Sequence, residues 1–262
     1  MVDDKNERRS VLGMAHLAKH TMQEIEFNEK LCEAFDASSL PLSVRMQNFS
    51  RSTRRQDISR FIVKYEMFKE ILSVNGSVIE CGVQSGGGFM AWYHFSTIFE
   101  PYNHTRKIIG FDTFEGFPHL DEKDVERGVS EHLKKGGLCT PSDMKEEIDN
   151  YISLHDLNRP LGHIPKAELI KGDACKTIPA YVEENPHLLI SLLYLDFDLY
   201  KPTKVALEFL FKRVVKGGIV AFDELNCQEF PGETTALLES LSLENVELRR
   251  SPFDPYISFF VK

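Results

Sequence analysis

The chain has 262 residues, of which 31 are basic and 40 are acidic, and its formal net charge is −9. At about 100–200 residues per domain, this length fits one large domain or a core domain with extensions, and it can bury a core without disulfides or a structural metal. The acidic balance argues against a nucleic-acid partner, because binding to a phosphate backbone requires a basic face.

The cysteines and the hydropathy pattern exclude further classes. Five cysteines are scattered along the chain and form no CxxC pair, so neither a disulfide framework nor a zinc site is indicated, and we expect free thiols in a reducing compartment. No run approaches the roughly 18 apolar residues of a membrane span. The first residues, MVDDKNERRS, are charged and show no secretory signal. A cytoplasmic, soluble protein with no membrane partner is predicted.

The N-terminal part, residues 1–70, is rich in charged and helix-forming residues. Helical patterns run over residues 14–35 and 57–72, and the second carries an apolar stripe at helical spacing. The stripe over 57–72 predicts a helix packed on the core. The N-terminal helices could also close over a site or pair two subunits.

From residue 76 onward, apolar runs alternate with helical patterns. Five runs are short, rich in Val, Ile, Leu and Phe, and typical of strands buried on both faces of a parallel sheet. They are residues 77–81, 107–111, 168–171, 190–195 and 218–222. Strand–helix alternation predicts an α/β fold, a doubly wound Rossmann-like sheet, over residues 71–262.

Two segments depart from this alternation. Residues 246–250 and 256–261 are strand-like with no room for a helix between them, so they must form a C-terminal antiparallel hairpin. Residues 113–165 are polar and form a long insertion after the second strand. Such an insertion would lie over the carboxyl edge of the sheet, where ligands bind, and cover a substrate.

A glycine-rich turn follows the first predicted strand. It reads ExGxxxG, with Glu80, Gly82 and Gly86, and lacks the strict GxGxxG dinucleotide pattern. Such a turn lets a ligand approach the backbone and offers helix N-terminal amides, although it could also be only a tight strand-to-helix turn. The Glu80 carboxylate could pair with a cationic ligand group such as an amino-acid ammonium.

Single acids follow the second and third predicted strands. In doubly wound folds, an acid at the end of the second strand accepts hydrogen bonds from ribose hydroxyls, and Asp112 has this position. Asp173 follows the third strand and could reach an adenine amino group. Asp112 could instead be a turn former or a helix cap.

Acidic pairs follow the fourth and fifth predicted strands. They are Asp196 with Asp198, and Asp223 with Glu224. Adjacent parallel strands lie about 4.8 Å apart, so these carboxylates should converge and repel one another. A divalent cation would relieve that repulsion, and an all-oxygen set suits Mg²⁺, Mn²⁺ or Ca²⁺ rather than zinc. The alternative is that these acids only cap the following helices.

Together these features resemble the class I S-adenosylmethionine-dependent methyltransferases. Within that class, three stretches resemble the macrocin O-methyltransferase family, whose members methylate sugar hydroxyls of macrolides and related natural products and require Mg²⁺. The stretches are RFIVKYEMFK at 60–69, FDTFEGFP at 111–118 and LDFDLYKPT at 195–203.

The resemblance implies roles for individual residues of this chain. The cofactor would contact six of them: Glu80, Gly82 and Gly86 at its methionine end, Asp112 at the ribose, and Asp173 and Ala174 at the adenine. The metal would be held by Asp196, Asp223 and Glu224.

Two residues depart from the family pattern. The family more often has aspartate where Glu224 stands, and glycine where Phe197 stands between the acids of the LDFDLY stretch. The first departure concerns the identity and geometry of the metal, and the second concerns the shape of the acceptor pocket.

The resemblance implies an S-adenosylmethionine-dependent O-methyltransferase that uses Mg²⁺ (or Mn²⁺). Its substrate would be a small molecule with a hydroxyl acceptor, such as a sugar or a natural-product glycoside. A cation would lower the pKa of that hydroxyl, and a carboxylate, first Asp196 and second Asp198, would take its proton. The family also implies a homodimer or a higher homo-oligomer, so residues 1–70 become a lid or dimerisation segment.

Other functions stay open at this point. A metal-independent N- or carboxyl-methyltransferase would use the acids only as caps. A nicotinamide-dependent oxidoreductase is disfavoured by the missing GxGxxG pattern and by the C-terminal hairpin. A catalytically silent binding module would have no need of clustered carboxylates at the strand ends.

Overall fold

A computed structural model describes residues 21–126 and 128–262. The chain divides into two compact units, Met1–Ser59 and Arg60–Lys262, and helix α4 (Arg55–Glu70) spans their boundary. The division into a lid or dimerisation segment over 1–70 and a core over 71–262 stays a prediction. The first unit contains α2 (Met22–Asp36), α3 (Leu42–Gln47) and a 3-10 turn at Phe49–Arg51. The predicted helix over 14–35 is confirmed from Met22, and residues 14–20 lie outside the described part.

The second unit alternates strands and helices. Its elements are β1 (Ser77–Cys81), α5 (Gly87–Phe99), β2 (Ile108–Asp112), α6 (Glu122–Val125), α7 (Met144–Asp156), β3 (Ala167–Lys171), α8 (Ala174–Glu184), β4 (Ile190–Leu195), α9 (Tyr200–Phe209), β5 (Val214–Phe222), α10 (Gly232–Ser240), β6 (Arg249–Arg250) and β7 (Ser258–Val261). Short 3-10 turns follow α9 at Phe211–Arg213 and α10 at Leu243–Asn245.

The strands form one seven-stranded sheet in the order β3-β2-β1-β4-β5-β7-β6. The pairs among β1 to β5 are parallel, whereas β7 pairs antiparallel with both β5 and β6. The predicted doubly wound α/β sheet and its C-terminal antiparallel hairpin are therefore confirmed. β1 lies between β2 and β4, and β5 follows β4, so the carboxyl ends of β1, β4 and β5 are neighbours.

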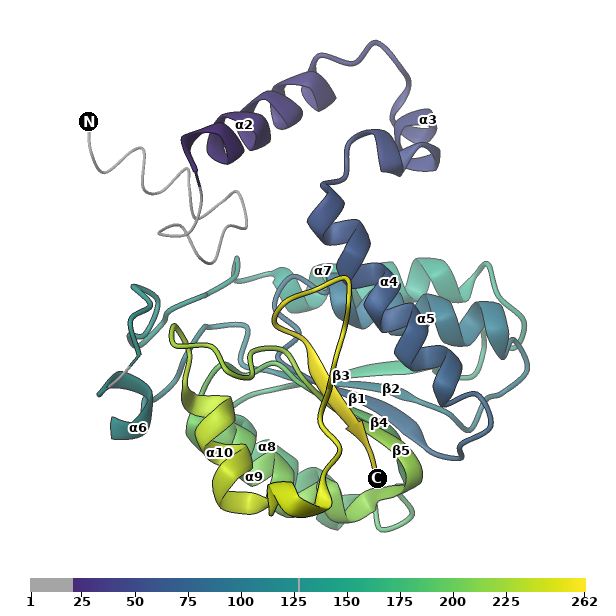
Figure 1. Ribbon diagram of the computed structural model, residues 1–262. Helices are drawn as coiled ribbons and strands as arrows, with labels where there is room; N and C mark the ends of the chain where they lie inside the picture. Colours follow the sequence, from purple (N-terminus) through teal and green to yellow (C-terminus); the bar gives the residue numbers. More distant parts are fainter. Residues whose placement is uncertain (1–20, 127) are drawn as a thin grey trace. The chain divides into compact units, whose positions relative to one another are not determined.

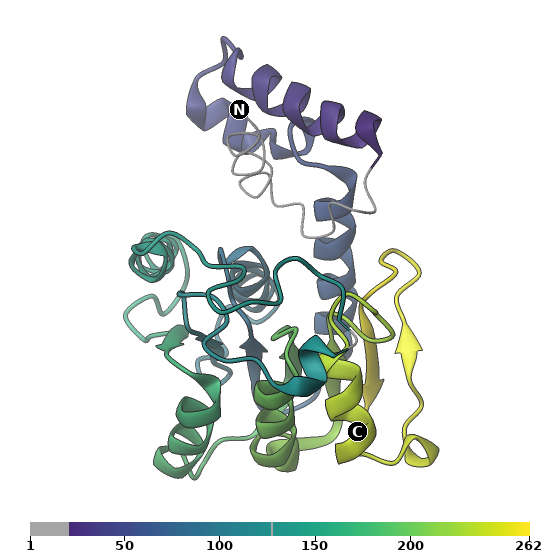
Figure 2. The same cartoon turned by 90° about the vertical axis from the view of Figure 1, so that its left-hand side faces the viewer.

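Helices cover both faces of the sheet because successive strand residues point to opposite sides. On one face, Val78, Leu192 and Ile219 pack with residues of α4, α5 and α7. On the other, Ile79 and Leu193 pack with residues of α8, α9 and α10. Figures 1 and 2 show the two helical layers. Burial on both sides explains why the parallel strands are continuous apolar runs.

The predicted insertion over residues 113–165 contains α6 and α7. Two residues of α7, Ile148 and Ile152, are buried and belong to the core on one face of the sheet. Part of this segment is therefore a structural layer, and its role in covering a substrate stays a prediction. No helix among the described residues is both long and apolar enough to cross a membrane.

Candidate active site

The glycine turn after β1 brings this strand end close to β4. Gly82 has φ +94°, and a Cβ at this position would overlap the backbone carbonyl of Asp196. Gly86 has φ +82° and is the N-cap of α5, where a Cβ would lie 2.8 Å from Cδ1 of Ile148. Both predicted glycines are therefore required by the backbone: each has a left-handed conformation and no space for a side chain.

Asp112 holds the glycine turn in place. Its Oδ2 accepts hydrogen bonds from the backbone amides of Val83 (2.7 Å) and Gln84 (2.8 Å), and its Oδ1 accepts one from Phe114 (2.6 Å). A carboxylate has about four acceptor positions, so capacity for a further donor remains. The structure thus places Asp112 beside the glycine turn, and ribose binding stays a prediction.

Asp173 is the N-cap of α8. Its side chain accepts a hydrogen bond of 3.0 Å from the backbone amide of Cys175. Asp173 therefore has a structural role as a helix cap, and contact with adenine stays a prediction. Ala174, the first residue of α8, is buried.

Glu80 is buried under the glycine turn and pairs with Lys64 of α4. Its Oε1 lies 3.3 Å from Lys64 Nζ, while its buried Oε2 has no hydrogen-bond partner. Lys64 Nζ also lies 3.4 Å from the ring centroid of Tyr194 and 5.0 Å from that of Trp92. Glu80 already has a protein cation beside it, and only Oε2 is left for the predicted ammonium group.

This arrangement makes the stability of the protein depend on pH. Burial raises the pKa of Glu80 from 4.5 to about 7, against the opposing effect of Lys64. The pKa of Glu80 is higher in the folded than in the unfolded protein, so ionisation of Glu80 favours unfolding. Stability that is present below pH 4.5 is therefore lost as the pH rises to about 7. Relative to Glu80→Gln, the wild-type protein should lose on the order of 2 kcal/mol over this range.

Urea unfolding at pH about 5 and about 8 measures this difference. The exposed Glu66, also on α4, provides the control Glu66→Gln, which should follow the wild type at both pH values. An equal pH dependence of the wild type and Glu80→Gln would contradict the assignment.

The acidic residues after β4 and β5 lie side by side. The amide of Asp196 donates to the Cys81 carbonyl at 2.7 Å, and the amide of Asp223 donates to the Leu195 carbonyl at 2.9 Å, so both strand ends continue the parallel pairing. Asp223 Oδ2 accepts a hydrogen bond of 2.6 Å from Arg60 Nη2, and its Oδ1 accepts one from the Tyr194 hydroxyl.

Charge repulsion is concentrated in this cluster. Desolvation, and then the charge of Asp223, raise the pKa of Asp196 well above its usual value. Desolvation, and then the charges of Asp196 and Glu224, do the same for the pKa of Asp198. Burial also opposes ionisation of Asp223, but Arg60 and nearby Lys64 outweigh it and hold the pKa of Asp223 below its ordinary value. Within the cluster, ionisation is therefore favoured for Asp223, which binds Arg60, and disfavoured for Asp196 and Asp198.

These acids do not cap the helices that follow them. The N-cap of α9 is Leu199 and that of α10 is Pro231, and neither makes a side-chain capping bond. The capping alternative is therefore wrong for the acids after β4 and β5. Their clustering requires another explanation.

Whether these residues could bind a divalent cation depends on the chemistry of their donor atoms and on the partners that those atoms already have. Asp196, Asp223 and Glu224 supply only carboxylate oxygens, which suits a hard cation, and the repulsion among them would be relieved by one. Across residues 21–126 and 128–262, however, no three His, Cys, Asp or Glu side chains stand together as a metal site. The donor set fits a cation chemically, although Arg60 and Tyr194 engage both oxygens of Asp223.

The structure adds four site residues that sequence reasoning missed: Arg60, Lys64, Tyr194 and Glu233. Arg60 also contacts Asp254 at 3.2 Å, which ties it to the loop between β6 and β7. The pairing of Arg60 with Asp223 joins residues that are 163 positions apart, and no local pattern signals it. The one available signal was that Arg60 and Lys64 stand within the first of the three family-like stretches.

Comparison with known proteins decides the family. A family model described as macrocin O-methyltransferase (TylF) matches residues 51–236. The chain belongs to the macrocin O-methyltransferase family. The family predicted from the sequence is therefore confirmed, and with it the class of enzyme, an O-methyltransferase.

Individual relatives agree with this assignment. The crystal structure of a calicheamicin methyltransferase, CalS11, is similar with a TM-score of 0.89 and 31% identity, covering 92% of this chain and 93% of that one. The apo structure of CalS11, described as a TDP-rhamnose 3'-O-methyltransferase, has a TM-score of 0.80 and 29% identity, covering 92% and 95% of the two chains.

A curated relative from Streptomyces olivaceus is 28% identical over 155 residues, which are 58% of this chain and 53% of the relative. It is an 8-demethyl-8-(2,3-dimethoxy-α-L-rhamnosyl)-tetracenomycin-C 4'-O-methyltransferase. The chain thus matches about half the length of this relative.

Proposed function

We propose that this protein transfers a methyl group from S-adenosylmethionine to a hydroxyl group of a sugar. The observation that carries the proposal is the convergence of the glycine turn after β1 with the carboxylates after β4 and β5 at one edge of the sheet. The names of both relatives describe substrates that contain rhamnose. In one the sugar is attached to a natural product, and in the other it is attached to a nucleotide. A deoxysugar in one of these two forms is the proposed acceptor.

The cofactor would lie along the carboxyl edge of β1, β2 and β3. Gly82 and Gly86 keep the turn free of side chains, so that a ligand can approach the backbone. Glu80 offers its unpartnered Oε2 to the methionine ammonium, and Asp112 has acceptor capacity left for ribose. Asp173 and Ala174 would flank the adenine at the start of α8.

The chemistry requires a positioned acceptor oxygen and a proton acceptor. The acceptor oxygen would bond to the methyl carbon as the carbon–sulfur bond breaks, with S-adenosylhomocysteine as the leaving group. A carboxylate of this chain would take the proton of the acceptor hydroxyl. Asp196 is the first candidate for this base and Asp198 the second, because both follow the strand adjacent to the glycine turn. Holding the oxygen in line with the methyl group supplies much of the rate.

A divalent cation, Mg²⁺ or Mn²⁺, is part of the proposal. Its ligands would be Asp196, Asp223 and Glu224. When bound, it would lower the pKa of the acceptor hydroxyl and fix the position of that group. Asp223 would then have to share or exchange its contact with Arg60.

The test is methyl transfer to a panel of acceptors. TDP-rhamnose, a rhamnosylated aglycone, a primary amine and a carboxylic acid are each incubated with S-adenosylmethionine and Mg²⁺. Product mass and S-adenosylhomocysteine release are then measured. A methylated sugar hydroxyl in either rhamnose compound supports the proposal. Methylation of only the amine or the acid, or turnover of none of the four, would overturn it.

Removal of metal is predicted to stop turnover without releasing the cofactor. After EDTA treatment, kcat should fall by at least about tenfold and return when Mg²⁺ is added. Calorimetric affinity for S-adenosylhomocysteine should stay within about twofold, because the proposed cofactor contacts lie at the ends of β1 to β3, whereas the proposed metal ligands follow β4 and β5. Full activity in EDTA would remove the metal from the proposal and favour the metal-independent alternative.

Association into a homodimer or a higher homo-oligomer, and a cytoplasmic location, stay predictions of the sequence. Light scattering of the purified full chain measures the first directly.

A further inference from the structure

A buried carboxylate on α10 joins the two acidic loops. Glu233 is in the first turn of α10, and its side chain is fully buried. Its Oε1 accepts hydrogen bonds from the backbone amides of Phe197 (3.1 Å) and Asp198 (3.2 Å), both after β4. Its Oε2 accepts one from the amide of Glu224 (3.1 Å), after β5. One side chain therefore fixes the backbone of both loops.

The conformation of the β4 loop shows why such a tie is needed. Asp198 has φ +62°, in the left-handed region that costs free energy for residues other than glycine. A backbone of this kind persists only where surrounding contacts hold it. Glu233 provides one such contact, because it binds the amide of Asp198 itself and that of the preceding residue.

The start of α10 is itself closely anchored. A Cβ at Gly232 would lie too close to the backbone of Tyr200, so α10 begins directly against the start of α9. Thr234 adds a second tie, since its hydroxyl accepts a hydrogen bond of 2.9 Å from the amide of Asn226 in the β5 loop. Glu233 therefore extends from a fixed helix start and not from a mobile loop.

The choice of a glutamate at position 233 also supports a role in holding the two loops. A fully buried carboxylate close to Asp198 and Asp223 is costly in electrostatic terms, and a neutral side chain would avoid that cost. The two carboxyl oxygens of Glu233 accept hydrogen bonds from three amide donors, whereas glutamine would turn an NH₂ group toward some of them. A carboxyl group therefore fits this position because of the three amides that it binds, and not because its burial favours folding.

The geometry points to Glu233 as a positioning residue. By binding the backbone of the loops after β4 and β5, it holds the acidic residues of the two loops in the relative positions that methyl transfer requires. This inference rests on the proposed function for its catalytic consequence. Its structural part, the tie between the two loops, stands independently of any activity.

Two variants test the inference. Glu233→Gln removes one acceptor, and Glu233→Asp keeps the carboxyl group but withdraws both oxygens by one methylene. Hydrogen exchange should become faster in peptides covering residues 196–199 and 223–226 of both variants, while exchange in β1 stays unchanged. In methyl transfer, kcat should fall by about 100-fold, whereas the KM for S-adenosylmethionine stays within about twofold.

The control is Glu239→Gln, a change of an exposed carboxylate on the same helix, which should alter neither readout. Unchanged exchange in both loops of the two variants would overturn the inference, as would loosened loops with kcat within about threefold of the wild type. If Glu233→Gln does not fold, Glu233→Asp gives the same readouts. If the wild type transfers no methyl group, the proposed function fails, and the exchange experiment still decides on the tie.

Discussion

Asp196→Asn is expected to lower kcat for methyl transfer by about 10²–10⁴-fold, which is the usual contribution of a positioned acid or base. Asn is nearly isosteric with Asp but cannot accept a proton and is a poor ligand for a cation. Affinity for S-adenosylhomocysteine, measured by calorimetry, should stay within about twofold, because Asp196 is not among the proposed cofactor contacts.

Loss of folding should not account for this effect. The backbone of Asp196 is fixed by its hydrogen bond to Cys81 and by the close approach to Gly82, and neither depends on the side chain. Desolvation and the charge of Asp223 already disfavour the ionised side chain of Asp196, so a neutral replacement relieves repulsion. The urea midpoint of Asp196→Asn should equal or exceed that of the wild type.

The matched control is Asp149→Asn, which changes a partly exposed carboxylate on α7 that pairs with Lys145. Its kcat and unfolding midpoint should both match the wild type. Retention of more than about a tenth of wild-type kcat in Asp196→Asn would assign the proton to Asp198, and Asp198→Asn would then have to show the larger loss.

The parallel sheet could be predicted because burial on both faces leaves a strong signal. β1 and β4 were predicted with their observed bounds, and β2 and β3 to within one residue. β5 begins at Val214, earlier than predicted, because the polar Lys216 interrupts the apolar run without interrupting the strand. α10 was missed because its sequence, GETTALLES, is short and mostly polar.

The candidate site likewise contains residues that the sequence predicts and residues that it does not. Acids that directly follow buried strands could be placed from the sequence, since the topology of a parallel sheet brings strand ends together. The groups that hold those acids could not be placed. Arg60, Lys64 and Glu233 are charged residues on helices, where a periodic pattern assigns charge to solvent, and their partners are distant in the sequence. Only the folded chain shows that these charges face the site.

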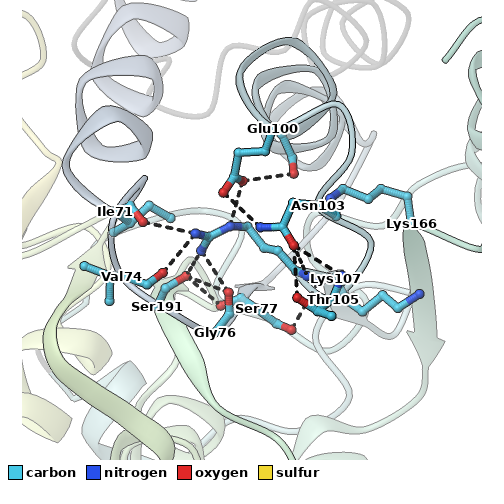
Figure 3. A network of polar contacts seen from close by, with 12 residues as sticks. Ile71, Val74, Gly76, Ser77, Glu100, Asn103, Thr105, Lys107, Lys166 and Ser191 are labelled. Carbon is cyan, nitrogen blue, oxygen red and sulfur yellow. Dashed lines mark hydrogen bonds and ion pairs between the residues drawn. The ribbon is translucent and has the colours of Figure 1, made fainter. Parts of the chain in front are cut away.

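A second network of charges lies at the opposite, amino edge of the sheet, and it predicts the largest effect on stability. Arg106 is buried just before β2. Figure 3 shows the network to which it belongs, with Glu100, Gly76 and Ser191 close together. The Nε of Arg106 donates to Glu100 at 2.7 Å, and its Nη1 donates to the Gly76 carbonyl at 2.8 Å and to the Ser191 hydroxyl. Its Nη2 donates to the carbonyls of Ile71 (3.1 Å) and Val74 (2.9 Å).

Arg106→Met is therefore expected to lower the free energy of unfolding by about 3–5 kcal/mol, because it leaves the mostly buried Glu100 carboxylate without its paired cation. Urea unfolding measures this loss, and Arg249→Met, which removes an exposed arginine paired with Glu247, should leave the midpoint unchanged.

The double variant Glu100→Gln with Arg106→Met should recover part of the loss, since it removes the unpaired charge. Methyl transfer per folded molecule should stay at the wild-type value, because Arg106 contacts the starts of the strands while the catalytic carboxylates follow their ends. A midpoint unchanged in Arg106→Met, or a double variant no more stable than the single one, would show that the buried ion pair does not hold this edge together.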